Sequence, residues 1–291
     1  MNHRKNHVLA VIGGSGLYDL ESLENVKKVR ISTPFGKPSG DVVQGTLGNT
    51  RMLFLPRHGE AHSISPSAIN YRANICALKL LGATHVLSIS AVGSMKEEIE
   101  PGHIVLVDQF VDLTKRREST FFDEGLAAHV AFADPVCPAM LDAAAKSAEA
   151  AQAHVHRGGS YVCIEGPQFS TRAESLIYRS WGVAVVGMTN MPEAKLAREA
   201  ELPFCTLALA TDYDCWHESE EAVTAKAVVA TLKNNVEVAK RVVVEMAKRL
   251  PDPAHSPAYR ALAGAMMTAP HNLSAEVRSR LDWLLNPYLD S

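Results

Sequence analysis

The 291-residue sequence lacks the cysteine pairs, the long apolar segments and the charge excess that mark several classes of protein. Its five cysteines form no C-x-x-C pair, which disfavours a zinc framework and a disulfide scaffold. A formal net charge of -3 offers no general attraction for nucleic acid or an anionic membrane, so any phosphate group must be bound locally. The apolar run that begins near residue 7 is too short for a signal peptide or a membrane span. We therefore expect a cytoplasmic protein that binds neither nucleic acid nor membrane.

Short apolar runs alternate with amphipathic segments along most of the chain. The runs predict strands at 7–12, 52–55, 85–90, 103–111, 161–164, 183–188 and 204–210. The amphipathic segments predict helices at 67–81, 138–153, 171–181, 192–201 and 221–250. Such alternation is typical of a single-domain α/β fold with a central mixed, largely parallel sheet flanked by helices. The apolar fraction of 47% is sufficient to bury one large core.

The composition changes at Pro251-Asp252-Pro253, where two prolines break the preceding helix. Two more helical patches follow, at 258–268 and 274–285. Residues 1–250 are therefore predicted to form the main part of the domain, and residues 251–291 a C-terminal helical extension of the same domain.

Two carboxylates, Asp212 and Asp214, stand one residue apart at the end of the apolar run 204–210. Ligands of open α/β sheets bind beyond the carboxyl ends of the strands, so this pair is a candidate for binding or acid–base chemistry. An acidic turn that caps the following helix accounts for the same residues equally well. The segment on its own does not decide between the two interpretations.

Three loops rich in hydrogen-bond donors follow the first, second and third strands of this pattern. They are Gly13-Gly14-Ser15-Gly16, Pro56-Arg57-His58-Gly59 and Ser88-Ile89-Ser90-Ala91. Glycines let backbone N–H groups approach an anion, and an arginine beside a histidine can clamp one. Each loop taken alone is explained by a tight turn and does not indicate an anion site. Because the carboxyl ends of parallel strands meet at one edge of a sheet, the three together predict a phosphate or sulfate site.

Two well-known motifs are incomplete in these loops. The first loop has Asp19 where the dinucleotide fingerprint G-x-G-x-x-G requires glycine, and it lacks the lysine of a P-loop. His58, Glu60 and His62 have H-x-E-x-H spacing in a loop, whereas zinc proteases carry H-E-x-x-H on a helix. A dinucleotide dehydrogenase is thus disfavoured, and we expect no metal site.

Two further strand-to-helix turns carry groups suited to a nucleoside. Phe169 follows the strand at 161–164 and can stack on a base, although an aromatic residue in that position more often belongs to the core. Met188 and Thr189 precede a helix and can offer donors to sugar hydroxyls and to an anion. An ordinary helix cap ahead of Pro192 explains the second turn as well.

The combination of these segments resembles the trimeric purine nucleoside phosphorylase family, and within it the enzymes that cleave 5′-methylthioadenosine. The resemblance covers about residues 7–245, in family order and at family-like spacing, and fades after Pro251. It therefore implies that residues 1–250 are a nucleoside phosphorylase domain. The segments that carry it are Gly13-Gly14-Ser15-Gly16, Thr33-Pro34-Phe35-Gly36-Lys37-Pro38-Ser39, Arg57-His58-Gly59, Asn70-Tyr71-Arg72-Ala73-Asn74, Glu165-Gly166-Pro167, Gly187-Met188-Thr189 and Ala210-Thr211-Asp212-Tyr213-Asp214-Cys215-Trp216.

The resemblance also implies roles for individual residues. The implied phosphate-binding residues are Ser15, Arg57, His58, Ser90, Ala91 and Thr189, with Ser90 standing where threonine is common. The implied nucleoside-binding residues are Met188 under the ribose, Phe169 beside the base, Asp212 and Asp214 at the base edge, and His129, which reaches the pocket of a neighbouring subunit. The positions associated with substrate preference are Ser170 and Ala225.

The implied reaction is the phosphorolysis of 5′-methylthioadenosine to adenine and 5-methylthioribose 1-phosphate, a step of purine and methionine salvage. A homotrimer would catalyse it without a cofactor, and inorganic phosphate would be a co-substrate. We expect Asp212 to supply a proton to N7 of the purine, because burial beside the charge of Asp214 should raise its pKa. Asp214 should accept a hydrogen bond from the 6-amino group, so a 6-oxo base, which presents lone pairs there, is disfavoured.

Three alternatives remain open from the sequence. A phosphorylase of 6-oxopurine nucleosides or of methylthioinosine shares the scaffold, but such relatives carry asparagine near the acidic pair. A hydrolase would use water and a carboxylate base, and would have no use for Arg57 and Ser90. A non-catalytic nucleotide-binding sensor would bind the nucleoside without turning it over.

Overall fold

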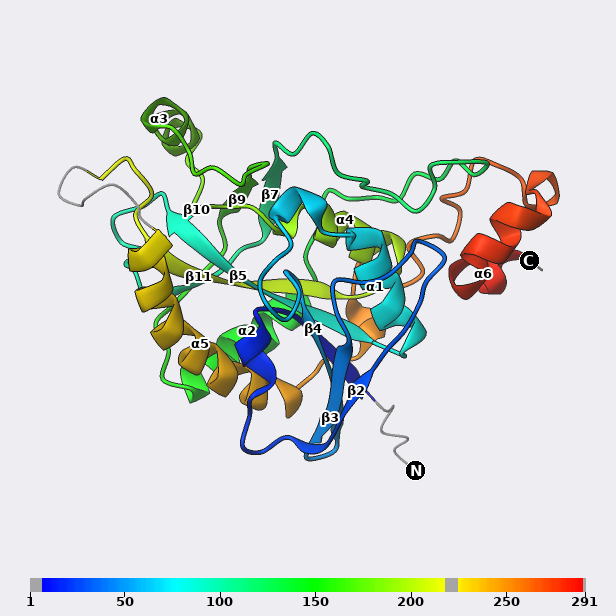
Figure 1. The fold of residues 1–291 in the computed structure, drawn as a ribbon. Helices are drawn as coiled ribbons and strands as arrows, with labels where there is room; N and C mark the ends of the chain where they lie inside the picture. The colour runs from blue at the N-terminus through cyan, green and yellow to red at the C-terminus, as the bar shows by residue number, and fades with distance from the viewer. Residues whose placement is uncertain (1–6, 218–224, 290–291) are drawn as a thin grey trace.

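The computed structural model describes residues 7–217 and 225–289, and for Ser15, Tyr18, 225–230 and Leu232 it describes the backbone alone (Figure 1). Within these ranges the strands form one mixed sheet. They are β1 (Val8–Gly13), β2 (Glu24–Val29), β3 (Val42–Leu47), β4 (Thr50–Pro56), β5 (His85–Ser94), β6 (Ile104–Leu106), β7 (Gln109–Asp112), β8 (Val155–Arg157), β9 (Ser160–Cys163), β10 (Val185–Gly187) and β11 (Phe204–Asp212).

The centre of the sheet is parallel and its antiparallel pairs lie around that centre. Strand β1 lies between β4 and β5 and is parallel to both, and β11 is parallel to β5. Strands β2, β3 and β4 pair antiparallel at one side. Strand β10 runs antiparallel to the last residues of β5. The predicted single-domain α/β fold with a mixed, largely parallel sheet is confirmed.

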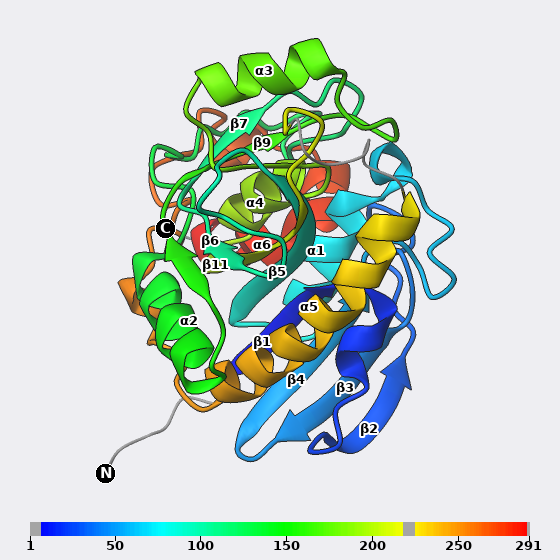
Figure 2. The same cartoon turned by 90° about the vertical axis from the view of Figure 1, so that its left-hand side faces the viewer.

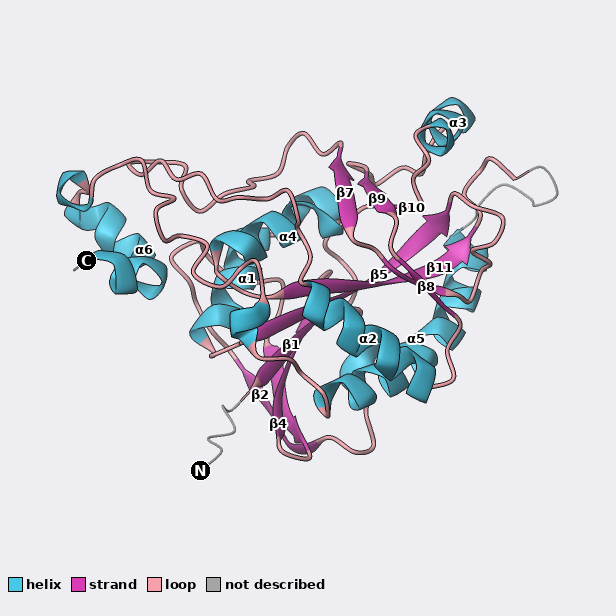
Figure 3. Ribbon diagram, turned by 180° about the vertical axis from the view of Figure 1, so that it is seen from behind, coloured by secondary structure: helices cyan, strands magenta, loops and turns pink. Residues whose placement is uncertain are grey.

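Helices cover both faces of this sheet (Figure 3). They are α1 (Tyr71–Leu80), α2 (Pro138–Ala150), α3 (Arg172–Ser180), α4 (Asn190–Glu199), α5 (Ala225–Ala247) and α6 (Ala275–Leu289), with short 3-10 turns at Ser15–Tyr18, Pro66–Ala68, Pro253–His255 and Pro270–Asn272. Helices α1 and α4 lie on one face, and α2 and α5 on the other. Helix α3 projects from the part of the molecule that holds β7 and β9 (Figure 2).

Side-chain alternation along β1 explains the two layers. Successive residues of a strand point to opposite faces. Ala10 and Ile12 join the apolar cluster that contains buried residues of α1, α4 and α6, whereas Leu9 and Val11 join the cluster of α2 and α5. A strand that is apolar at every position is therefore buried on both faces, as the continuous run in the sequence indicated.

The sequence prediction was wrong at some elements, each for a local reason. Strand β2 has five exposed residues of six and lacks the apolar alternation that predicts a strand, so it was missed, as were β3 and β8. The run 103–111 splits into β6 and β7. The patch 258–268 forms turns instead of a helix, because Arg260 (φ 53°) and Gly264 (φ 74°) adopt left-handed backbone conformations. Of the helix predicted at 221–250, residues 221–224 lie outside the described ranges.

Two further observations concern the cysteines and the lengths of the apolar helices. All five cysteines are free thiols. No helix in the described ranges is both long and apolar enough to cross a membrane.

Candidate active site

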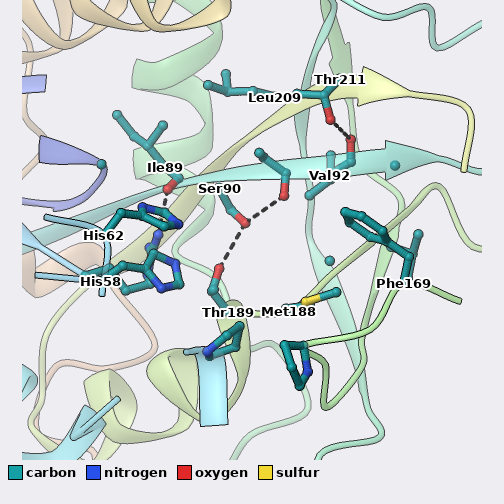
Figure 4. Close-up of a pocket in the computed structure, with 18 of the residues that line it drawn as sticks. His58, His62, Ile89, Ser90, Val92, Phe169, Met188, Thr189, Leu209 and Thr211 are labelled. Atoms are coloured by element: carbon teal, nitrogen blue, oxygen red, sulfur yellow. Dashed lines mark hydrogen bonds between the residues drawn. The ribbon is translucent and has the colours of Figure 1, made fainter. Parts of the chain in front are cut away.

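A cavity of about 820 Å³ opens at the carboxyl ends of the central strands. Its walls come from the loops after β1, β4 and β9, from the second half of β5, and from the ends of β10 and β11. This is the edge at which α/β sheets bind ligands, and the volume suits a small molecule. His58 and His62 lie at one end of the cavity and Phe169 at the other, with Ser90, Thr189 and Met188 between them (Figure 4).

Ser90 and Thr189 place two hydroxyl groups together on the cavity wall. Ser90 Oγ lies 3.0 Å from Thr189 Oγ1, and both residues are buried. Thr189 occupies the N-cap position of α4, yet its side chain makes no capping hydrogen bond. The helix-cap interpretation of this turn therefore does not account for the hydroxyl of Thr189, which is directed to Ser90 instead (Figure 4).

Arg57 provides a fixed positive charge at the cavity. Its Nε lies 2.9 Å from Glu193 Oε2 and its Nη2 lies 3.0 Å from Glu193 Oε1, while Nη1 donates to the Ile89 carbonyl at 2.8 Å. Burial opposes the charged form of Arg57, but the neighbouring Glu193 carboxylate outweighs it and raises the pKa of the guanidinium. The bidentate partner of Arg57 is thus a carboxylate of its own chain, which orients the guanidinium beside the cavity.

His58 faces the cavity as a neutral ring. Burial, followed by the charge of Arg57, lowers the pKa of His58 to about 4. Its Nδ1 lies 2.8 Å from the carbonyl oxygen of Ile64. A carbonyl can only accept, so Nδ1 carries the hydrogen and Nε2 is the acceptor of the neutral ring. The ring of His62 stands next to it, with 4.4 Å between the ring centroids.

The acidic pair stands at the end of β11, where a bulge interrupts the ladder with β5. The register shifts between Ala210 and Asp212, and Thr211 Oγ1 lies 2.7 Å from Asp212 Oδ2. The Asp214 backbone N–H donates to Asp212 Oδ1 at 2.8 Å. A bulge beside a site re-aims side chains in this way. Both carboxylates line the cavity.

The strand opposite the bulge carries a glycine, Gly93, at a closely packed position. A Cβ atom at Gly93 would lie 3.1 Å from Asp212 Oδ1 and 3.2 Å from Asp214 Cβ. The tight fit keeps the two carboxyl groups against β5. Asp214 itself has φ of 53°, a left-handed conformation that aspartate and asparagine adopt more readily than most residues.

Two serine hydroxyl groups surround Asp214 at this end of the cavity. Burial raises the pKa of Asp214, and hydrogen bonds from the hydroxyl groups of Ser175 and Ser170 oppose that rise. Ser170 and Asp214 both line the cavity.

Met188 and Phe169 also line the cavity, with Met188 between its two ends and Phe169 at the end opposite His58 and His62. Phe169 is 49% exposed at the rim, which excludes the alternative that its ring belongs to the core. The Met188 carbonyl accepts a hydrogen bond of 2.7 Å from Arg117 Nη1, and the Glu165 carbonyl accepts one of 2.7 Å from Arg117 Nη2. Arg117 thereby ties the turn after β9 to the turn after β10.

The structure does not bring every predicted residue to the cavity. Ala91 lines it, but His129 is exposed in the loop between β7 and α2 and is not among the lining residues. Ser15 begins the 3-10 turn after β1, and Ala225 begins α5. The side chains of Ser15 and Ala225 lie outside the described part of the chain.

Sequence reasoning missed several residues of the site. Arg117 follows two other basic residues in Lys115-Arg116-Arg117, a pattern that normally indicates a solvated surface. Glu193 reads as a polar residue of a helix, although it is 1% exposed. His62 was considered only as part of a metal motif with His58, which was set aside, whereas His58 was itself an implied phosphate-binding residue. Within the described ranges no cluster of three or more His, Cys, Asp or Glu side chains is placed to hold a metal ion.

Residues 8–248 match the phosphorylase superfamily. The chain belongs to this superfamily. Among its relatives in the superfamily, the S-methyl-5′-thioadenosine phosphorylase of Geobacter sulfurreducens is 52% identical over 283 residues, which cover 97% of this chain and 99% of that protein. The S-methyl-5′-thioadenosine phosphorylase of Thermosynechococcus vestitus is 48% identical over 285 residues, covering 97% of this chain and 99% of that protein.

Solved structures of the superfamily share the fold closely. A crystal structure of a methylthioadenosine phosphorylase from an antarctic soil metagenomic library has a TM-score of 0.91 and 47% identity, and covers 97% of this chain and 100% of that chain. The methylthioadenosine phosphorylase of Schistosoma mansoni in complex with adenine has a TM-score of 0.84 and 35% identity, covering 89% of this chain and 99% of that chain.

Proposed function

We propose that this chain catalyses the phosphorolysis of S-methyl-5′-thioadenosine, which yields adenine and 5-methylthioribose 1-phosphate and serves purine and methionine salvage. The observation that carries the proposal is the set of relatives named for this activity, which align with nearly the whole chain. The cavity supports it independently, because it combines an end that holds Arg57 and two hydroxyl groups with an acidic end. A small nucleoside and inorganic phosphate are its substrates.

We assign the acidic end to the purine. Cleavage of the N-glycosidic bond develops negative charge on the departing base, which a proton at N7 neutralises. Two adjacent carboxyl groups can share one proton, because like charges disfavour double ionisation. Asp212 donates to N7 in this assignment. Asp214 accepts from the 6-amino group, and Ser170 lines the cavity beside it.

We assign the opposite end to phosphate. Arg57 contributes positive charge, Ser90 and Thr189 contribute hydroxyl groups, and His58 contributes a neutral ring. A phosphate held there attacks C1′, and its charge stabilises the cationic sugar of the transition state. Met188 then contacts the nucleoside between the two ends, and Phe169 contacts it at the rim.

The active assembly is a homotrimer in this proposal, and it works in the cytoplasm. His129 is exposed and lies away from its own cavity, so it is free to close the cavity of a neighbour. Five free thiols fit a reducing compartment. Light scattering coupled to size exclusion tests the assembly: a mass three times 31.5 kDa is expected, and a monomer would contradict it. No cofactor is proposed beside inorganic phosphate, so activity should survive dialysis against a chelator.

The alternative substrates are distinguished by one assay. The purified protein is given S-methyl-5′-thioadenosine, adenosine and methylthioinosine at saturating phosphate, and the released bases are measured. We expect the methylthio adenine nucleoside to have the highest kcat/KM. A preference for methylthioinosine would contradict the role of Asp212 and Asp214, and binding without release of base would favour a sensor.

A further inference from the structure

A third hydroxyl group lies behind Ser90 and Thr189. It belongs to Tyr161 of β9, whose side chain is 0% exposed. Tyr161 Oη lies 3.1 Å from Ser90 Oγ, and the Thr189 backbone N–H donates to Tyr161 Oη at 3.4 Å. Together with the 3.0 Å contact between Ser90 Oγ and Thr189 Oγ1, these contacts form a continuous chain of three hydroxyl groups. Ser90 and Thr189 line the cavity, and Tyr161 is the buried end of the chain.

The backbone is shaped to accept this hydroxyl group. A Cβ atom at Gly187 would lie 2.1 Å from Tyr161 Oη and 2.6 Å from Tyr161 Cζ. Any side chain at residue 187 would therefore displace the phenol. Because Gly187 comes two residues before Thr189, the same glycine brings the Thr189 N–H within reach of Tyr161.

The three hydroxyl groups have a preferred direction of hydrogen-bond donation when an anion is bound. The Thr189 N–H can only donate, so Tyr161 Oη accepts from it. We infer that the Tyr161 proton points to Ser90 Oγ, the hydroxyl oxygen 3.1 Å away. Burial raises the pKa of Tyr161, which therefore stays a donor. The Ser90 proton has two acceptors within reach, the Ala91 carbonyl oxygen at 3.3 Å and Thr189 Oγ1 at 3.0 Å. Donation to the nearer one, Thr189 Oγ1, frees the Thr189 proton for the cavity. A charged acceptor strengthens such a bond, and donors in series polarise one another.

We propose that Tyr161 is a positioning residue for the nucleophile: through Ser90 it turns the Thr189 hydroxyl toward the bound phosphate. The proposal rests on the proposed function, because it takes inorganic phosphate as the anion at this end of the cavity. Tyr161 does not contact phosphate itself. Without its hydroxyl group, the Ser90 and Thr189 protons can be shared in several arrangements, and fewer of them point a donor at the anion.

The variant Tyr161→Phe tests this and keeps the buried ring. We expect KM for phosphate, and Kd for inorganic phosphate measured by calorimetry, to rise about three- to tenfold, which is the net effect of one buried hydrogen bond. KM for the nucleoside at saturating phosphate should stay the same. A merely structural role would change thermal stability while leaving phosphate affinity alone.

Two further variants make the test specific. Tyr288 lies on α6, outside the cavity walls, and its hydroxyl group donates to Glu201 Oε1 at 2.6 Å. Tyr288→Phe removes this hydroxyl group and should leave phosphate affinity unchanged. Ser90→Ala breaks the chain between Tyr161 and Thr189. In that background Tyr161→Phe should raise the phosphate KM by less than about twofold, since coupled residues are not additive.

Three results would overturn the proposal. They are an unchanged phosphate Kd in Tyr161→Phe, equal rises in KM for both substrates, and a full effect of Tyr161→Phe in the Ser90→Ala background. Failure of the proposed function is separate, because the unaltered protein would then show no phosphate-dependent release of base.

Discussion

The guanidinium of Arg57 and the carboxylate of Glu193 form a buried bidentate ion pair beside the cavity, with Nε–Oε2 and Nη2–Oε1 distances of 2.9 and 3.0 Å. The Ser88 hydroxyl also donates to Glu193 Oε1 at 2.6 Å. Both oxygens of the carboxylate are therefore satisfied within the protein. Any change at Arg57 acts on this pair as well as on a bound anion, and the two effects must be measured separately.

Replacement of Arg57 by alanine should mainly destabilise the protein. It leaves Glu193, which is 1% exposed, as an unpaired buried carboxylate, and such losses cost about 3–5 kcal/mol. Urea denaturation of Arg57→Ala measures this free energy of unfolding. A loss below about 1 kcal/mol would show that the pair contributes as little as a surface ion pair does.

The phosphate role of Arg57 is better tested with Arg57→Lys, which keeps a positive charge beside Glu193. Lysine lacks the planar fork, so we expect KM for phosphate to rise roughly tenfold or more, the effect of losing a charge-assisted hydrogen bond. KM for the nucleoside should change much less. Steady-state kinetics with each substrate varied in turn gives the comparison, and equal rises in the two KM values would mean that Arg57 is structural.

Asp214→Asn should shift base preference toward 6-oxopurines. Asparagine tolerates the left-handed conformation of residue 214, so the backbone should be preserved. Its amide can donate to a 6-oxo group, whereas the carboxylate accepts from a 6-amino group. We expect the ratio of kcat/KM for methylthioadenosine over methylthioinosine to fall at least about tenfold, since mismatched buried polar groups discriminate strongly. An unchanged ratio would contradict the role of Asp214 in reading the base.

Acid should destabilise the folded protein through two buried histidines. Burial lowers the pKa of His58 and of His85 from 6.5 to about 4. Between pH 4 and 6.5 the unfolded chain binds more protons than the folded one. The contribution of the two neutral histidines to the free energy of unfolding is therefore complete above pH 6.5 and is lost as pH falls toward 4. Each histidine contributes a slope of up to about 1.4 kcal/mol per pH unit in that window.

His85 provides the check on this pH dependence, because it lies outside the cavity walls. His85→Gln should flatten the dependence of unfolding free energy on pH between 4 and 6.5 relative to the unaltered protein. Burial raises the pKa of Glu199 to about 7, so Glu199 makes the free energy of unfolding fall as pH rises, opposite to the effect of the histidines. Both proteins contain Glu199, so its contribution cancels when their curves are compared. Parallel curves for both proteins would contradict the assignment to His85.

The sequence predicted the layers and the edge that carries the site, because both depend on local patterns. Continuous apolar runs identified β1, β5 and β11, and the polar residues predicted to follow strands identified the cavity walls at Arg57, Ser90 and Asp212. The loop predicted at 88–91 was wrong, because β5 continues to Ser94 and Ser90 lies within it. The exposed edge strand β2 was missed because it buries too little apolar surface to leave a pattern. The turns at 257–265 were missed because nothing in the sequence requires Arg260 to take a left-handed conformation.

The supporting residues of the site could not be predicted, because their partners are distant in the chain. Arg57 and Glu193 are separated by 136 residues, and Tyr161 and Ser90 by 71. An arginine after a strand predicts an anion site, but no local pattern shows that a carboxylate of the same chain already binds it. In the same way, the sequence around Tyr161 predicts an aromatic residue of a strand and does not show that its hydroxyl group contacts Ser90.

The most direct test of the account is adenine release from S-methyl-5′-thioadenosine by the purified protein, with and without inorganic phosphate. Phosphorus NMR of the same reaction follows the sugar product. We predict that adenine appears only when phosphate is present, together with one equivalent of 5-methylthioribose 1-phosphate. Equal adenine release without phosphate, and no sugar phosphate in the spectrum, would show a hydrolase and contradict the central claim.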